Sequence, residues 1–374
     1  MGNKKNISIG MMIFIFLVIN SSAFGQQRPK NIIIMIGDGM GLPQIYTAMV
    51  ANNNHLALED CTYSGFSKTY SADHFTTDSG AGGTAIACGI KTKNGMIGMG
   101  PDSVKVTSIL EISEQNQLST GIVVACAVTH ATPASFIAHQ VDRDMYEEIA
   151  ADYLKTDIDV FIGGGRQYFE KRKDKRNLLN ELKNKNYQLA STLEEVKKIK
   201  SGKLAGLLYE DHPSSIPERG NMLPEATMAA IDILDNNPKG FFLMVEGSQI
   251  DWAAHDNNTK QIIKEMLDFD QTIQQVLNYA KEKGNTLVII TADHETGGMT
   301  LLDGKMGSDS LKAEFSTKNH SGIPVPVFAF GPGAENFTGF MENTDFKPKI
   351  EKLLDLKDND SAIKIKNNIH KKNQ

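Results

Sequence analysis

Six short apolar runs recur along the chain, and they constrain the fold more than any other feature. They cover residues 31–36, 121–127, 159–162, 241–245, 286–291 and 325–330. Segments with helical spacing lie between them, for example at 224–234 and 259–281. Strands that are apolar on both faces are typical of parallel sheets covered by helices. The pattern therefore predicts an α/β fold with a central, largely parallel sheet flanked by helices on both faces.

Polar residues that can do chemistry follow several of these runs directly. They are Asp38 after the first run, His130 and Thr132 after 121–127, Glu246 after 241–245, and Asp293 and His294 after 286–291. In open α/β sheets, ligands bind at the carboxyl ends of the strands. The regular placement therefore predicts one active site at that end of the sheet.

The length and charge of the chain limit its class. Its 374 residues suffice for one large domain, and a net charge of -6 argues against nucleic-acid binding through bulk positive charge. The 3 cysteines are too few for a disulfide framework. Residues 171–203 are rich in Lys and Arg and carry no site-like motif. We therefore expect residues 26–374 to form a single domain with a small peripheral insertion at about 165–222.

The N-terminus has the pattern of a secretory signal. Lys4 and Lys5 precede an apolar run at 7–19, and the small residues Ala23 and Gly25 follow it. This run is short for a membrane span. We expect residues 1–25 to be a signal peptide and the mature protein to be periplasmic or secreted, with no membrane span. A retained N-terminal anchor is the alternative.

A run of small residues follows Ser79 in the segment 77–85. Small side chains let an anion such as phosphate approach the start of a helix, where backbone N–H groups and the helix dipole favour it. Ser79 is therefore a candidate nucleophile, although the chain has no G-x-S-x-G elbow. The alternative is a simple helix cap by Asp78 or Ser79.

Aspartates and histidines form a candidate metal-binding set. Asp251 and His255 are four residues apart and share one face of a helix, a pairing that suits zinc. A surface Asp–His pair, or a structural histidine at His320, is the alternative for each motif alone. Together, six residues suffice for two zinc ions: Asp38, Asp251, His255, Asp293, His294 and His320. Asp38, Thr132 and Glu246 offer oxygens for a third, harder ion such as magnesium.

In sequence order, these motifs resemble the alkaline phosphatase family. The matching segments are 31–41, 77–79, 130–134, 246–255, 291–294 and 320–322. The resemblance covers most of the chain after residue 25. It implies a metal-dependent hydrolase that acts on small phosphate monoesters through a phosphoserine intermediate and releases inorganic phosphate. It also implies two zinc ions, one magnesium ion and a possible homodimer.

The resemblance assigns roles to individual residues. Ser79 corresponds to the nucleophile, and Arg143 to the arginine whose forked donors grip phosphate. The backbone N–H of Asp78 helps to hold that phosphate. The implied ligands are Asp251, His255 and His320 for the first zinc; Asp38, Asp293, His294 and Ser79 for the second; and Asp38, Thr132 and Glu246 for magnesium.

Two positions differ from some members of the family. His130 stands where some members have an aspartate near magnesium, and we expect it to contact the magnesium shell through water and to let zinc compete for the site. Trp252 stands where others have Lys or His near the phosphate. Both residues are assigned to the substrate-binding surface.

Other functions fit the same residues less well. A phosphodiesterase or a related phosphoryl-transfer enzyme of the same superfamily is the main alternative. A sulfatase is disfavoured because no cysteine opens a C-x-P-x-R motif. A metal-binding protein without catalysis would leave Ser79 and Arg143 without a role.

Overall fold

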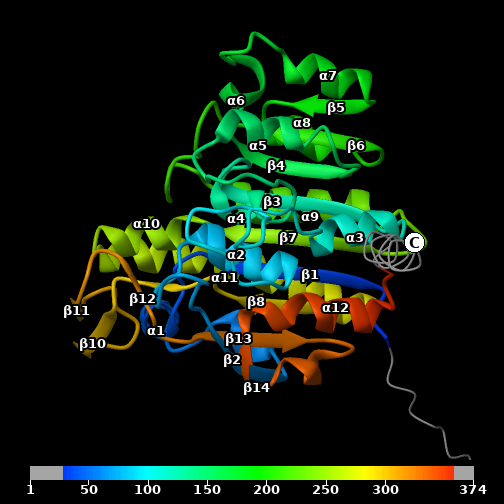
Figure 1. The fold of residues 1–374 in the computed structure, drawn as a ribbon. Helices are drawn as coiled ribbons and strands as arrows, with labels where there is room; N and C mark the ends of the chain where they lie inside the picture. The colour runs from blue at the N-terminus through cyan, green and yellow to red at the C-terminus, as the bar shows by residue number, and fades with distance from the viewer. Residues whose placement is uncertain (1–27, 358–374) are drawn as a thin grey trace, which may run out of the picture.

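A ten-stranded sheet forms the centre of the computed structural model, which describes residues 28–357 (Figure 1). Its strand order is β14-β2-β13-β8-β1-β7-β3-β4-β6-β5. The strands are β1 Asn31–Gly37, β2 Tyr63–Lys68, β3 Ser119–Ala127, β4 Val160–Gly164, β5 Tyr187–Ala190, β6 Lys203–Leu207, β7 Phe241–Gly247, β8 Thr286–Thr291, β13 Val325–Phe330 and β14 Gly339–Glu342. Neighbouring strands pair in parallel except at β13, which is antiparallel to β8 and β2. The prediction of a largely parallel sheet is therefore confirmed.

The central strand β1 shows why the apolar runs become buried strands. It pairs with β7 and β8, with Ile33 opposite Leu243 and Val288. Alternate side chains enter opposite cores, because Ile32 and Ile34 pack in one hydrophobic cluster and Ile33 in the other. Complete burial of each isoleucine contributes about 1.5–3 kcal/mol.

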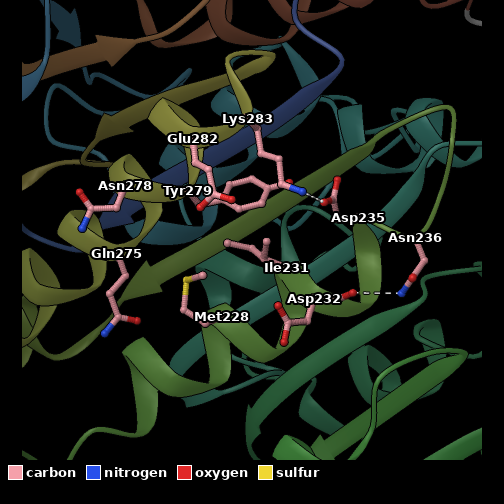
Figure 2. A pocket seen from close by; sticks show the side chains of 10 residues that line it. All are labelled: Met228, Ile231, Asp232, Asp235, Asn236, Gln275, Asn278, Tyr279, Glu282 and Lys283. Atoms are coloured by element: carbon pink, nitrogen blue, oxygen red, sulfur yellow. Dashed lines mark hydrogen bonds and ion pairs between the residues drawn. The ribbon is translucent and has the colours of Figure 1, made fainter.

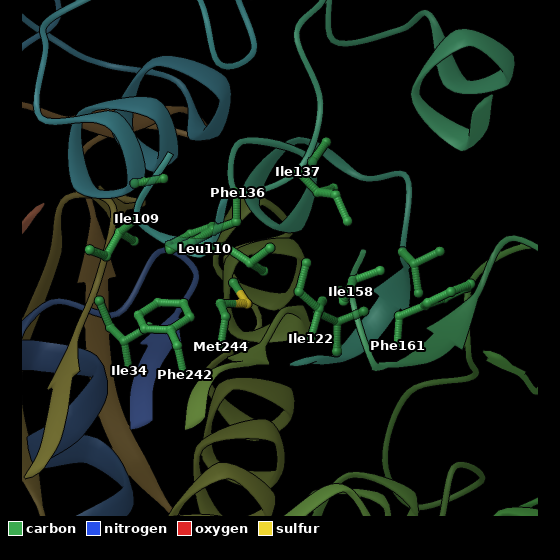
Figure 3. Packing of buried hydrophobic residues seen from close by; sticks show 14 of the residues in the cluster. Ile34, Ile109, Leu110, Ile122, Phe136, Ile137, Ile158, Phe161, Phe242 and Met244 are labelled. Atoms are coloured by element: carbon green, nitrogen blue, oxygen red, sulfur yellow. The ribbon is translucent and has the colours of Figure 1, made fainter. Parts of the chain in front are cut away.

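Helices cover both faces, as the sequence predicts. One face is packed by α2 Ser79–Cys88, α3 Ile109–Gln115, α4 Ala131–Ala134, α5 Tyr146–Asp152, α6 Gln167–Glu170, α7 Leu178–Asn184 and α12 Phe346–Leu354. The other is packed by α1 Leu42–Ala51, α8 Leu193–Lys198, α9 Met222–Leu234, α10 Gln249–His255 and α11 Thr259–Lys283. Figure 3 shows the first core, where Ile34, Phe242 and Met244 of the sheet meet Ile109 and Phe136.

The helix α11 is the longest helix in the described part of the chain, and its ends follow from local sequence. Its N-cap Asn258 accepts a hydrogen bond from the Gln261 N–H, and the helix ends at Gly284, whose φ is 68°. Apolar residues at helical spacing place Ile262, Met266 and Ile273 in the core.

The basic segment predicted as a peripheral insertion lies at one side of the sheet, at the top of Figure 1. It contributes α6, α7 and α8, and also the edge strands β6 and β5, which extend the sheet beyond β4. The domain boundaries themselves stay a prediction. The predicted signal peptide at 1–25 lies outside the described residues. No helix among residues 28–357 is long and apolar enough to cross a membrane.

Two short pieces complete the structure. One is the antiparallel pair β10 Met299–Gly304 and β11 Leu311–Phe315, and the other pairs β9 Glu295–Thr296 with β12 His320–Ser321. The second pair brings His320 back beside the segment that follows β8.

Candidate active site

The carboxyl ends of the central strands bring the predicted residues together. Asp38 directly follows β1, Glu246 lies near the end of β7, and Asp293 and His294 follow β8. All four side chains are buried. The turn after β1 requires a glycine: Gly39 has φ 72°, and a Cβ there would lie 2.8 Å from Asp251 Cα.

Ser79 is the first residue of α2 and lies beside this group. Its Oγ is 3.2 Å from His294 Nε2 and 3.4 Å from Asp38 Oδ2. Asp78 caps the helix, because its Oδ1 accepts a hydrogen bond from the Ala81 N–H at 2.9 Å. Asp78 therefore caps α2, as the simpler interpretation of the motif predicts. Ser79 also lies close to Asp38 and His294, as the functional interpretation predicts.

The small residues of α2 permit close packing against the ligand segments. A Cβ at Gly82 would lie 3.1 Å from the Asp293 carbonyl oxygen, and one at Gly83 would lie 2.9 Å from Ser135 Oγ. A larger side chain at Gly82 would therefore crowd Asp293, and one at Gly83 would crowd Ser135.

Asp251, His255 and His320 form one cluster. His255 Nε2 lies 3.3 Å from Asp251 Oδ2 and 3.2 Å from His320 Nε2. Each imidazole donates its other nitrogen to a carbonyl oxygen: His255 Nδ1 to Lys318 and His320 Nδ1 to Thr77. This fixes the tautomer in which the converging Nε2 atoms carry lone pairs, as metal-binding histidines require.

Asp38, Asp293 and His294 form a second cluster. His294 Nε2 lies 3.2 Å from Asp293 Oδ2 and 3.5 Å from Asp38 Oδ1. The backbone N–H groups of Gly39 and His294 donate to Asp293 Oδ1 at 3.3 and 3.0 Å. Within the described residues, Asp38 Oδ1 and Asp293 Oδ2 are buried without a hydrogen-bond partner. Buried carboxylate oxygens are normally satisfied, so these two atoms fit the ligands of a cation.

The acidic groups strongly perturb one another. Burial and the neighbouring carboxylates raise the pKa of Asp38 well above its ordinary value and that of Asp293 to about 7. Burial raises the pKa of Glu246 to about 8. Burial alone would raise the pKa of Asp251 too, but the neighbouring imidazoles of His255, His294 and His320 hold it below its ordinary value. These buried carboxylates can all be ionised together only if bound cations neutralise their negative charges.

Glu246 belongs to a third group. Two of the three predicted magnesium ligands contact each other: Thr132 Oγ1 donates to Asp38 Oδ2 at 3.3 Å. Cys126 Sγ lies 3.3 Å from Glu246 Oε2, and His130 completes a set of three possible metal-binding side chains. Sequence reasoning missed Cys126. The sequence places Cys126 near the end of the apolar run 121–127, but its approach to Glu246 depends on the register of β3 against β7, in which Val124 is the partner of Glu246.

A cavity of about 470 Å³ opens over these clusters. Its lining includes Ser79, Arg143, Trp252, His255 and His320. The Arg143 guanidinium donates to Asp78 Oδ2 at 2.9 Å, so a side chain eleven positions after Thr132 does reach the N-cap of α2, the helix that begins at Ser79.

Trp252 and His130 form one wall beside this cavity. His130 contacts the rings of Trp252 and His212 edge-on, with centroids 5.9 and 5.7 Å apart. His212 had no expected role, yet its Nδ1 accepts a hydrogen bond from the Ala127 N–H at 3.0 Å. Burial lowers the pKa of His130 to about 3, so the ring is neutral.

A second cavity, of about 560 Å³, lies between α9 and α11 (Figure 2). It is lined by the last turns of both helices, where Lys283 Nζ pairs with Asp235 Oδ2 at 2.8 Å. Because β7 and β8 begin just after these helices, this cavity lies at the amino ends of the strands. That is the wrong end of a parallel sheet for an active site, and none of the predicted site residues lines it.

Fold and site together define an α/β metalloenzyme whose metal-binding groups surround a serine at a helix start. A family model described as alkaline phosphatase matches residues 29–314. Alkaline phosphatase 4 of Bacillus subtilis is 36% identical, over 87% of this chain and 88% of that protein. The Escherichia coli alkaline phosphatase is 30% identical, over 88% and 86%. The solved alkaline phosphatase from the Antarctic bacterium TAB5 is 43% identical, with TM-score 0.85, over 88% of this chain and 100% of that one.

The chain therefore belongs to the alkaline phosphatase family, and the predicted resemblance is confirmed. It is a metal-dependent hydrolase of phosphate monoesters.

Proposed function

We propose that Ser79 is the nucleophile of this phosphatase. Its Oγ attacks the phosphorus of a monoester in line with the ester oxygen, which leaves as the alcohol and takes up a proton. Water then attacks the phosphorus of phosphoserine from the side on which the alcohol left. This second displacement restores the Ser79 hydroxyl and releases inorganic phosphate. Two such displacements give net retention at phosphorus. The approach of Ser79 Oγ to within 3.2 Å of His294 and 3.4 Å of Asp38 is the observation that carries this assignment.

The donor sets fit three divalent cations. The set with imidazoles and a carboxylate, Asp251, His255 and His320, suits zinc. Asp38, Asp293 and His294, with Ser79 Oγ, suit a second zinc. Asp38, Thr132 and Glu246 offer oxygens that suit magnesium. When bound, such ions lower the pKa of a hydroxyl or a water and stabilise negative charge on phosphoryl and leaving-group oxygens.

Arg143 binds the phosphoryl group in this proposal. Its guanidinium is held at the mouth of the site by Asp78, and its remaining donors can pair with two phosphoryl oxygens. The Asp78 N–H donates to Asn94 Oδ1 at 3.1 Å in the structure, so it reaches phosphate in this proposal only by giving up that bond. Trp252 and His130 line the side of the substrate cavity, and His130 meets the magnesium shell through water. Because these contacts recognise phosphate, they predict broad specificity toward the alcohol.

The test is hydrolysis of p-nitrophenyl phosphate at mildly alkaline pH. Activity is measured before chelation, after chelation, and after zinc and magnesium are added back separately and together. We expect full activity only with both metals. Activity that survives complete metal removal would contradict the proposal, and a preference for bis(p-nitrophenyl) phosphate would indicate a diesterase.

Two further proposals concern the whole protein. We propose that it is exported to the periplasm or the medium, on the basis of the sequence pattern at residues 1–25. N-terminal sequencing of the secreted or periplasmic form tests this, with cleavage after Gly25 expected. A homodimer stays a prediction, and the mass of the purified protein in solution tests it.

A further inference from the structure

Cys126 lies inside the site and has no part in the reaction described above. It is the penultimate residue of β3 and is fully buried. Its Sγ lies 3.3 Å from Glu246 Oε2 and 3.2 Å from the Ala127 carbonyl oxygen. A thiol therefore touches a carboxylate that the proposed function assigns to the third cation.

Two buried atoms beside Cys126 lack partners. Within the described residues, His130 Nδ1 and Glu246 Oε1 make no hydrogen bond, although the side chains are 8% and 0% exposed. Cys126, His130 and Glu246 each offer one ligand atom, and these atoms lie within 4.8 Å of one another. One sulfur, one imidazole nitrogen and one carboxylate oxygen thus lie close together, from β3, the start of α4 and β7.

The neighbouring contacts hold this arrangement. The edges of Trp252 and His212 lie against the His130 ring. His212 also accepts the N–H of Ala127, the residue that follows Cys126. The Thr132 hydroxyl donates to Asp38 Oδ2, and Glu246 has the hydroxyls of Thr132 and Ser248 as well as the Cys126 thiol beside it.

We propose that Cys126, His130 and Glu246 form a zinc-type site that shares Glu246 with the proposed magnesium set. Thiolate and imidazole ligands select zinc and related transition ions, whereas magnesium requires oxygens in near-octahedral geometry. As the metal–sulfur bond forms, the thiol proton passes to solvent. Because one carboxylate serves both sets, occupation by zinc and by magnesium excludes each other. The inference rests on the proposed function only in assigning Glu246 to a cation.

X-ray absorption at the zinc edge of the fully zinc-loaded wild-type protein tests the ligand directly. We expect a sulfur shell at about 2.3 Å beside nitrogen and oxygen ligands near 2.0 Å. The shell should disappear in Cys126→Ser and persist in Cys88→Ser, a matched control in which another buried cysteine is replaced outside the site. A wild-type spectrum without sulfur, or a sulfur shell that survives in Cys126→Ser, would overturn the proposal.

Cobalt(II) gives a second readout. We expect titration of the metal-depleted protein with cobalt to produce a sulfur-to-cobalt charge-transfer band in the near ultraviolet. The band should be present in Cys88→Ser and absent in Cys126→Ser, and magnesium in excess should weaken it. A band insensitive to magnesium would overturn the sharing of Glu246.

Phosphatase assays on the same samples separate the two proposals. If zinc and magnesium fully activate the protein but no sulfur signal is seen, only the proposed cysteine site is rejected. A sulfur signal in a protein that no metal activates rejects the proposed function instead.

Discussion

The hydrogen bond from His320 Nδ1 to the Thr77 carbonyl oxygen, 2.8 Å long, joins a metal-binding segment to the segment that carries Ser79. A carbonyl oxygen only accepts, so the bond fixes the proton on Nδ1 and leaves the Nε2 lone pair facing His255. One contact between segments far apart in sequence therefore joins the proposed nucleophile segment to the proposed first zinc site.

Ser79→Ala should remove almost all turnover and leave the metals in place. The variant deletes the only atom proposed to attack phosphorus, so we expect kcat to fall by about 10³-fold or more. Steady-state hydrolysis of p-nitrophenyl phosphate and metal analysis of the same sample check this. Ser113→Ala, which changes a buried serine bonded to the Ile109 carbonyl oxygen, is the control. Near-normal turnover in Ser79→Ala would refute the nucleophile assignment.

Arg143→Ala should weaken phosphate recognition. The loss of a charged donor from the cavity should lower kcat/KM by about 10- to 100-fold, equivalent to 1.5–3 kcal/mol, and weaken inhibition by inorganic phosphate. Competition assays with phosphate measure the second effect. Arg166→Ala, which removes an arginine paired with Glu170 away from this cavity, should leave both quantities unchanged. Equal phosphate inhibition in Arg143→Ala and wild type would contradict the role.

Glu295→Gln should loosen zinc binding without touching a ligand. The buried Glu295 carboxylate accepts from the Gln44 side chain at 2.9 Å and the Gly298 and Met299 N–H groups at 3.1 Å each, and it also accepts from the Ser321 hydroxyl. An amide cannot accept at both ends, so the pairing of β9 with β12 is disturbed and His320 shifts.

We expect zinc affinity to fall by about 10-fold or more in Glu295→Gln, measured by competition with a chromophoric chelator. Glu314→Gln on β11 is a control outside the hydrogen bonds of β9 with β12. If zinc affinity in Glu295→Gln equals that of wild type, the carboxylate does not position the ligand.

Metal removal should destabilise the fold as well as abolish activity. Without cations, the carboxylates of Asp38, Asp251 and Asp293 are buried close to one another, which costs free energy. Ions at a thousand times their Kd stabilise the native state by about 4 kcal/mol. Thermal melts with chelator, and again after zinc and magnesium return, should show a lowered and then restored Tm. An unchanged Tm would mean that these carboxylates are not held by metals.

Glu114→Gln should change how stability depends on pH. Burial raises the pKa of Glu114 to about 7, above the value of about 4.3 for the unfolded chain. Between these values the unfolded chain releases the proton and the folded protein keeps it, so the free energy of unfolding falls as pH rises. The Glu114 carboxylate accepts from the Asp157 N–H and from the Thr120 hydroxyl. The glutamine oxygen can still accept from the Asp157 N–H, and its NH₂ group can donate to the Thr120 oxygen once that hydroxyl rotates.

Urea unfolding at pH 4 to 8 checks this prediction. We expect Glu114→Gln to be more stable than wild type at pH 8 by roughly 2 kcal/mol and to match it more closely at pH 4. The exposed Glu218→Gln should follow the wild-type curve. If the free energy of unfolding changes with pH in the same way in Glu114→Gln and in wild type, the Glu114 carboxyl does not cause the pH dependence.

The main strands could be predicted because both their faces are apolar. Each of the six expected runs is a strand of the sheet, and the helix expected at 259–281 is α11. The strands β5 and β2 were not predicted, because they mix polar and apolar residues and have exposed positions. Strands of this kind depend on their neighbours rather than on their own pattern; β5 lies at the edge of the sheet, and β2 lies between β14 and β13.

The predicted site residues lie together because parallel strands end at the same side of a sheet. That argument needs only the position of each residue in its run. It could not find Cys126 or Glu295, whose contacts depend on strand register and on the return of β12 to β9. The catalytic and metal-binding roles of the predicted residues stay predictions.

The donors of the site come from segments between Asp38 and His320. The ribosome must therefore make most of the chain before any complete metal-binding set exists. Chains that end before residue 246 complete none of these sets, and chains that end before residue 320 lack the proposed first zinc set. We therefore expect metal capture to be a late event in biogenesis, and we expect a product truncated before residue 320 to stay inactive under the role proposed for His320.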